Sequence, residues 1–416
     1  MIFIGTGVVP SFANVLDDNV ETEARTNMNE SKKWTFMFYD DADFPGYDPL
    51  IDTVGGLTFA EAAYSGEDVD VIVLQDIENG PATMWYVDES HNIEKLEDMG
   101  EVNMENGSTL KNFVEYCKDE YPAERYVLAI YNHGGGIWGS CIDYASNGDI
   151  LTMDEMQKAL TESGGVDILC FSAPCLMGAV ECVYELRDCV DVYVGSEEIS
   201  GYTLWHDAMG SLCDTLNENP DISNIDLGEK IIEWIEEDAK TNIKWGSLLS
   251  MSAIRTDKIE DLATSIDELS IYLNENFNDA INNIRKTRRK TKEVGRPILH
   301  WFEYRQSIDF LDFIQKYNEI ESDPIICQHL QNITEAFNEA VIKECHRFLR
   351  RKTNGLSIYF PMTTLSYGYS STYHNVGYGL DFPQDTHWDE FLLKYKSSGI
   401  EVFYTFFPFL RPRISM

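Results

Sequence analysis

The chain lacks several features that mark common classes of protein. No apolar run reaches the ~18 residues that a membrane-spanning helix needs, so no transmembrane segment is predicted. The nine cysteines form no CxxC pair and no zinc-ribbon spacing, so no structural metal site is expected. Basic residues are scarce, with 32 Lys and Arg against 71 Asp and Glu and a net charge of −39. Because such a surface repels phosphate backbones, nucleic acid is not expected as a partner.

The composition is nevertheless that of a folded protein. Hydrophobic residues make up 44% of the 416 residues and aromatic residues 12%, enough for a large core and a second, smaller unit. Most cysteines are expected to be buried free thiols, because free Cys behaves as a small hydrophobic residue. The acidic excess either keeps the surface soluble or attracts calcium and basic peptides, and both readings remain open.

The N-terminus looks like the remainder of a secretory signal. An apolar stretch, residues 2–10, is followed by Ser11-Phe12-Ala13, a small-x-small cleavage pattern. We therefore predict a secreted or cell-surface protein, with an ordinary N-terminus as the alternative. The tail at 402–410 is apolar and aromatic but too short to span a membrane.

Short apolar strands alternate with amphipathic helices along the first 255 residues. This pattern predicts an α/β fold with a mainly parallel central sheet and helices on both faces. Residues 256–350 have Ile, Leu and Phe at helical spacing, and residues 356–361 read as a late strand that returns to the main sheet. The predicted organisation is a leader at 1–32, the main α/β domain at 33–255, a smaller, mostly helical C-terminal part at 256–395 and an apolar tail at 396–416.

Two potentially reactive side chains follow apolar strands of this predicted sheet. His133 stands before three glycines after the strand 126–131, and Cys175 follows the strand 166–171. Ligands of parallel α/β sheets bind at the carboxyl ends of strands, where both residues fall. A helix predicted to begin near Leu176 would stabilise a Cys175 thiolate through its dipole, and a nearby imidazole would accept the thiol proton. A lone His and a lone Cys are more often structural than catalytic, so spacing alone does not decide between these roles.

The motifs around these residues resemble the clostripain family of cysteine peptidases. The segment 131–139, Tyr-Asn-His-Gly-Gly-Gly-Ile-Trp-Gly, is similar to the family's histidine motif, and 175–181 is similar to its nucleophile motif. The strand 33–39 and the stretch 194–201 extend the resemblance. It implies the caspase-like α/β sandwich that this family shares with caspases, legumains and gingipains. It also implies hydrolysis of peptide or protein substrates through a thioester acyl-enzyme.

The resemblance assigns roles to individual residues of this chain. Cys175 is the expected nucleophile and His133 the expected base, and the backbone amides of Gly134 and Cys175 are the candidates for the oxyanion hole. Glu181, six residues after Cys175, is expected to be structural. The nucleophile segment departs from the family, because Ser-Ala-Pro precedes Cys175 where an Asp usually helps to bind Arg or Lys. Cleavage after Arg or Lys is the first expectation, with substrate-binding candidates Ala173, Ser196, Glu197, Glu198 and Asp207.

Two other functions and one possible cofactor stay open at this point. The altered segment before Cys175 also suits a catalytically inactive relative that binds peptides or acts as a surface module. A metal hydrolase using the aspartates near residue 40 is disfavoured, because no clustered His ligands accompany them. No cofactor is required by the sequence. Calcium dependence occurs in the family, and Asp40, Asp41 and Asp43 are close enough in sequence to be its ligands.

Overall fold

The structure is a computed structural model of the chain. The chain divides into residues 1–31 and a compact unit, Lys32–Met416. Residues 1–30 of the predicted leader, Asp43, Pro174 and the end of the tail after residue 406 lie outside the described part, and Lys32 already belongs to the first strand. The residues described are 31–42, 62–77, 80–141, 150–173, 175–199, 206–241, 249–295, 307–347, 353–361, 373 and 379–406.

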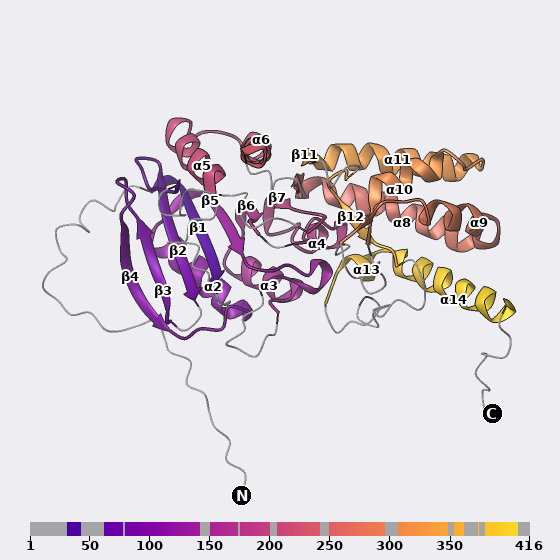
Figure 1. Ribbon diagram of the computed structural model, residues 1–416, viewed down its shortest axis with the longest axis horizontal. Coiled ribbons are helices and arrows are strands. Elements are labelled where there is room, and N and C mark those ends of the chain that lie inside the picture. Colours follow the sequence, from indigo (N-terminus) through magenta and orange to yellow (C-terminus); the bar gives the residue numbers. More distant parts are fainter. Residues whose placement is uncertain are drawn as a thin grey trace, which may run out of the picture. The chain divides into compact units, whose positions relative to one another are not determined.

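The described chain contains a nine-stranded sheet with the order β11-β8-β7-β6-β5-β1-β2-β3-β4 (Figure 1). The five central strands, from β7 to β2, are parallel to one another, and antiparallel pairs complete the sheet at each edge. The prediction of a mainly parallel sheet is therefore confirmed. The strands are β1 (Lys32–Ala42), β2 (Val69–Ile77), β3 (Ala82–Val87), β4 (Ile93–Gly100), β5 (Ala123–Tyr131), β6 (Val166–Phe171), β7 (Val190–Gly195), β8 (Ser250–Arg255) and β11 (Val341–His346).

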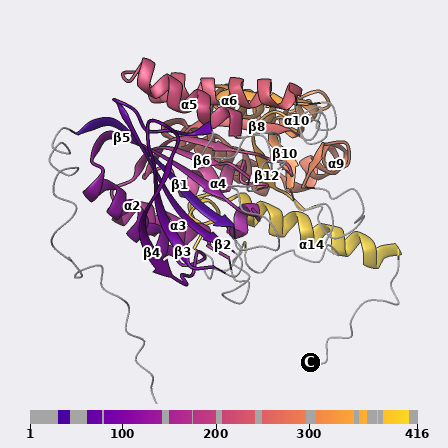
Figure 2. The same ribbon diagram turned by 60° about the vertical axis from the view of Figure 1, so that its left-hand side comes forward.

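The central strands contain long apolar runs because both faces of the sheet are covered. In β1, Phe36 and Phe38 belong to one core cluster, whereas Met37 and Tyr39 belong to the other. Helices α5 (His206–Glu218) and α6 (Asn224–Thr241) contribute to the first cluster. Helices α2 (Gly107–Glu120), α3 (Met153–Glu162) and α4 (Val180–Glu185) contribute to the second, on the opposite side of the sheet (Figure 2). This period-two alternation explains why each strand reads as a continuous hydrophobic run.

The C-terminal region adds helices, one strand of the main sheet and a second sheet. Its helices are α8 (Ile259–Glu275), α9 (Phe277–Arg288), α10 (Phe310–Asn318), α11 (Pro324–Ala340), α13 (Phe382–Asp385) and α14 (Trp388–Phe406). The small sheet joins β12 (Ser357–Tyr359), β10 (Ser307–Asp309) and β9 (Glu293–Val294). No helix in the described residues is long and apolar enough to cross a membrane.

The prediction that residues 356–361 return to the main sheet is wrong. The returning strand is β11, which pairs antiparallel with β8. Strand β12 pairs with β10 instead, and Ser357 also forms a parallel bridge with Ala179, close after Cys175. The apolar character of 356–361 therefore reflects burial between the C-terminal region and the nucleophile segment rather than a place in the large sheet.

Buried glutamates fasten the C-terminal region to the segments around Cys175. Each lies within 23 residues of Cys175 in sequence, is no more than 2% exposed and accepts a backbone N–H from the C-terminal region. The pairs are Glu181 with Tyr359 at 2.9 Å, Glu185 with Asp381 at 2.7 Å, Glu197 with Gly355 at 3.1 Å and Glu198 with Gly295 at 3.0 Å. Glu181 also accepts from the Tyr373 hydroxyl at 2.9 Å, so it has the structural contacts that the sequence suggests.

Burial raises the pKa of Glu181, and that of Glu185, to about 7. The charged form of a carboxyl group is penalised where water is excluded. The folded state therefore holds these protons more tightly than the unfolded state, in which the pKa of Glu is near 4.5. The free energy of unfolding must then fall as the pH rises from about 4.5 to about 7.

We expect Glu181→Gln to flatten this pH dependence. A pKa difference of this size corresponds to about 3 kcal/mol of unfolding free energy, which the wild type loses between pH 4.5 and pH 8 and the variant does not. Denaturant unfolding at pH 5 and pH 8 measures the difference. The control is Glu89→Gln, because Glu89 is exposed. An equal loss of stability in the wild type and Glu181→Gln would contradict the expectation.

Candidate active site

The loop that carries His133 is fixed to the ends of β1 and β5. The carbonyl of His133 accepts hydrogen bonds from Ser140 Oγ at 3.0 Å and from the Cys141 N–H at 3.1 Å. The side chain of Asn132 is buried, donates to the Asp41 carbonyl at 2.8 Å and accepts from the His133 N–H. These contacts hold the backbone of His133 where β5 leaves the sheet.

The same loop orients the amide predicted to bind an oxyanion. Gly134 and Ser140 form an isolated antiparallel bridge, whose hydrogen bonds run from Cys141 to His133 and from Gly135 to Gly139. In this kind of pair the N–H of the central residue points away from the partner strand. Among the described residues, no hydrogen bond uses the Gly134 N–H. This geometry suits the oxyanion role.

His133 itself is half-buried. Partial burial lowers the pKa of His133 below its ordinary value of 6.5, because the imidazolium form loses hydration. The imidazole is therefore mainly neutral near pH 7 and able to accept a proton, as a general base must.

Cys175 differs from most other thiols of the chain. None of the nine cysteines forms a disulfide bond, and the structure buries every one except Cys175 and Cys327, which are half-exposed. The prediction of buried free thiols is confirmed for these seven. Burial raises the pKa of the buried thiols, for example that of Cys189 to about 11. Such thiols are poorly ionised and poorly accessible. Cys327 lies on α11, whereas Cys175 lies on a loop that leaves the sheet after β6.

The segment after Cys175 is not the helix that the sequence predicts. Helix α4 begins at Val180, so its N-terminus is five residues away from Cys175 and the dipole argument is wrong. Leu176 instead has a left-handed backbone, with φ of 66°. Its N–H donates to the Glu198 carbonyl at 3.1 Å, and the Gly178 N–H donates to the Ser196 carbonyl at 2.8 Å. The segment pairs with the loop after β7 before it enters the helix.

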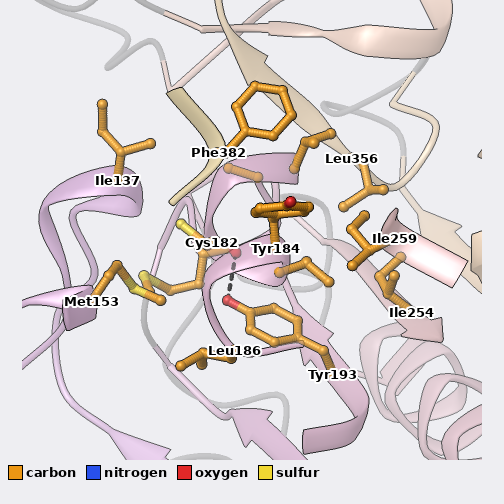
Figure 3. Close-up of a cluster of buried hydrophobic side chains, with 14 of the residues drawn as sticks. Ile137, Met153, Cys182, Tyr184, Leu186, Tyr193, Ile254, Ile259, Leu356 and Phe382 are labelled. Carbon is orange, nitrogen blue, oxygen red and sulfur yellow. Dashed lines mark hydrogen bonds between the residues drawn. The ribbon is translucent and has the colours of Figure 1, made fainter. Parts of the chain in front are cut away.

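The histidine loop and the nucleophile loop lie in contact. They leave the neighbouring parallel strands β5 and β6, where Ile130 pairs with Phe171. A Cβ added to Gly136 would lie 3.1 Å from the Leu176 carbonyl oxygen, so the loops touch one residue beyond Cys175. Figure 3 shows Ile137, next to Gly136, among the buried side chains that surround α4. The structure therefore brings the two predicted loops together.

The comparisons with known proteins agree with this arrangement. Residues 58–396 match the family model for the clostripain family, peptidase C11. The chain belongs to the clostripain family. It is a cysteine peptidase, and it is 27% identical over 442 aligned positions to clostripain of Hathewaya histolytica, covering 88% of this chain and 81% of that protein.

Solved structures of other C11 proteases share the fold of this clostripain-family chain. A secreted C11 cysteine protease of Bacteroides thetaiotaomicron, bound to an irreversible peptide inhibitor, has a TM-score of 0.61 and 15% identity, covering 86% of this chain and 99% of that chain. An inactive zymogen C11 protease of Parabacteroides distasonis has a TM-score of 0.58 and 18% identity, covering 80% and 93%. The caspase-like fold class predicted from the sequence is confirmed.

The structure does not place most of the predicted substrate-binding side chains at an open surface. Ala173 is part of the core, and the Ser196 hydroxyl donates to the Glu198 carbonyl at 3.0 Å within its own loop. Glu197 is 1% exposed and bonds Gly355, and the carboxylate of Glu198 holds the C-terminal region. The expectation that these two acids present a charge to a pocket is therefore corrected. Asp207 lies in α5, and its side chain is outside the described residues.

Two of the three aspartates named as candidate calcium ligands lie in the described chain. Asp40 and Asp41 are fully buried, and Asp40 accepts from Gln75 Nε2 at 2.9 Å. No group of three or more His, Cys, Asp or Glu side chains among the described residues has a geometry that would hold a metal ion. Asp43 lies outside these residues, and calcium dependence stays a prediction.

Sequence reasoning missed two glycine contacts around Leu176. Gly136 entered the sequence analysis only as one of the three glycines after His133, and Gly295 was not considered. Both have positive φ, at 62° and 68°, and both pack against Leu176. The glycine run 134–136 gave a signal for the first contact, whereas nothing near Gly295 in the sequence indicates the second.

We expect iodoacetamide to modify Cys175 before any other thiol of the folded protein. Contact with the loop of the mainly neutral His133, which can accept the thiol proton, favours Cys175 by about tenfold or more over the equally half-exposed Cys327, and the seven buried thiols stay protected. Timed quenching followed by peptide mapping gives the rate for each cysteine, with Cys175→Ala as the control. Faster modification of Cys327 or of a buried thiol would contradict the assignment.

Proposed function

We propose that the chain is an endopeptidase that cleaves peptide bonds with a dyad of Cys175 and His133. The Cys175 sulfur attacks the scissile carbonyl while His133 accepts the thiol proton. The N–H groups of Gly134 and Cys175 stabilise the oxyanion. His133 then gives its proton to the leaving amine, which produces a thioester. Water, deprotonated by His133, hydrolyses this thioester and regenerates the thiol.

The observation that carries this proposal is the contact between the two loops. Gly136 of the histidine loop meets the carbonyl of Leu176, the residue after Cys175. Further support comes from the half-exposed thiol and the half-buried imidazole, kept largely neutral by burial, which belong to touching loops at adjoining strand ends. These are the two groups and the location that acyl transfer to a thiol requires.

Kinetics of single-residue variants test the dyad. Cys175→Ala and His133→Ala should each lower kcat/KM for a fluorogenic peptide by about a thousandfold or more, because nucleophile and base act as one unit. Cys327→Ala is the matched control, since Cys327 is also half-exposed but lies on α11. Unchanged turnover by Cys175→Ala would refute the proposed dyad and favour another catalytic mechanism, whereas no turnover by the wild type would favour a binding module.

We further propose that the residue before the cut is Arg or Lys. The support is the resemblance to the family and the net charge of −39, which favours basic peptides. The buried Glu197 and Glu198 do not supply the charge of the binding pocket, so Asp207 is the remaining candidate among the acids named from the sequence.

Matched substrates test this preference. A peptide with Arg before the cut should be cleaved with a kcat/KM about tenfold or more above that of the same peptide with citrulline, a neutral isostere. Asp207→Asn should reduce the ratio. Equal cleavage of the two peptides by the wild type would refute the proposed preference for Arg or Lys but would not affect the proposed dyad.

Export is proposed on the strength of the N-terminal sequence. The apolar residues 2–10 and the Ser11-Phe12-Ala13 pattern support it. One structural neighbour is described as a secreted C11 cysteine protease. A secreted or cell-surface location would give the peptidase access to external peptides.

A further inference from the structure

Leu176 is enclosed by two glycines that come from distant parts of the chain. Gly136 belongs to the histidine loop and Gly295 to the C-terminal region. An added Cβ would lie 3.1 Å from the Leu176 carbonyl oxygen in the first case and 2.9 Å from Leu176 Cδ2 in the second. Leu176 adopts a left-handed backbone with φ of 66°, which a leucine keeps only where its surroundings impose it.

Glu198 contacts both Leu176 and the segment that carries Gly295. Its backbone carbonyl accepts the Leu176 N–H at 3.1 Å. Its carboxylate accepts the Gly295 N–H at 3.0 Å through Oε2 and pairs with Lys292 Nζ at 3.3 Å through Oε1. The Glu198 side chain is 1% exposed and that of Lys292 21% exposed, so the ion pair is largely withdrawn from water.

We propose that Glu198 is a positioning residue, which fixes the nucleophile loop by holding Lys292–Gly295 against Leu176. The proposal rests on the proposed role of Cys175. The orientation of the Cys175 sulfur depends on the peptide units on either side of Cys175, and the unit on its C-terminal side ends at the Leu176 N–H. Glu198 holds this amide through its backbone carbonyl and the neighbouring segment through its carboxylate, and its position therefore sets the direction of attack.

Glu185 provides a comparison that separates positioning from stability. It is 2% exposed and, like Glu198, accepts a backbone N–H of the C-terminal region, that of Asp381 at 2.7 Å. No hydrogen bond or ion pair between described residues joins Glu185 to Leu176 or to Lys292–Gly295. Loss of the Glu185 side chain should weaken the docking of the C-terminal region without changing the orientation of the Cys175 sulfur.

A pair of glycine variants tests the contact between Leu176 and Gly295 by changing the glycine. Gly295 and Gly379 both have φ of 68°, and an added Cβ would lie 2.9 Å from a neighbouring side chain in each case. That neighbour is Leu176 for Gly295 and Asp154 for Gly379. Gly295→Ala should slow iodoacetamide modification of Cys175, and lower kcat, by about fivefold or more. Gly379→Ala, which carries the same backbone strain, should change either quantity by less than about twofold.

The carboxylate itself is tested by three further variants. Glu198→Ala should lower kcat and the alkylation rate of Cys175 by about tenfold or more, with KM nearly unchanged. Glu198→Gln keeps an oxygen for the Gly295 N–H and should restore most of the loss. Glu185→Ala should lower the thermal midpoint while the reactivity of Cys175 stays within about twofold of wild type.

The outcomes separate this proposal from the proposed function. Equal losses of Cys175 reactivity in Glu198→Ala and Glu185→Ala, or in Gly295→Ala and Gly379→Ala, would overturn the positioning role while the dyad stands. Full turnover by Cys175→Ala would overturn the dyad itself. If Glu198→Ala does not fold, the two glycine variants decide, because each leaves the buried carboxylate in place.

Discussion

The site depends on the backbone hydrogen bonds that hold Leu176 and Gly178, just after Cys175, in place. The Leu176 and Gly178 N–H groups donate to the carbonyls of Glu198 and Ser196, and the Gly178 carbonyl accepts the Ser357 N–H at 2.9 Å. A Cβ on Gly178 would lie 2.7 Å from the Glu197 nitrogen, so only glycine permits this approach. The nucleophile loop is thus bonded on one side to the strand-end loop of β7 and on the other to β12.

This constraint makes the C-terminal region part of the catalytic unit. The parallel strands bring the loops of His133 and Cys175 to one edge of the sheet, but they do not fix the backbone of residues 176–179. The loop after β7 holds these residues together with β12, the segment Lys292–Gly295 and the buried glutamates that bind the C-terminal region. Burial penalises the charged form of the carboxyl groups that hold this region, so the stability of its docking depends on pH. Stability and geometry of the nucleophile loop are therefore linked through the same contacts.

The sequence predicted the central sheet well and the details of the site less well. Strands such as β1 and β6 carry apolar runs because most of their residues are buried between the two layers of helices. The edge strand β4 was missed, since charged residues dominate its exposed surface. Helix α4 was predicted four residues too early because Leu176 and Gly178 bond to other segments first. Glu197 and Glu198 were misassigned because their partners, Gly355 and Gly295, lie about a hundred residues or more away in sequence.

The central claim is that the sulfur of Cys175 and the imidazole of His133 face each other across the two touching loops. A short bifunctional reagent, 1,3-dibromoacetone, tests it most directly, since its first alkylation consumes a reactive thiol and its second requires a nucleophile within reach. After the folded protein has reacted with one equivalent of 1,3-dibromoacetone, peptide mapping should recover the segment around Cys175 joined to the segment around His133. Recovery of Cys175 alkylated at one end only, or bridged to another residue while His133 stays unmodified, would contradict the account.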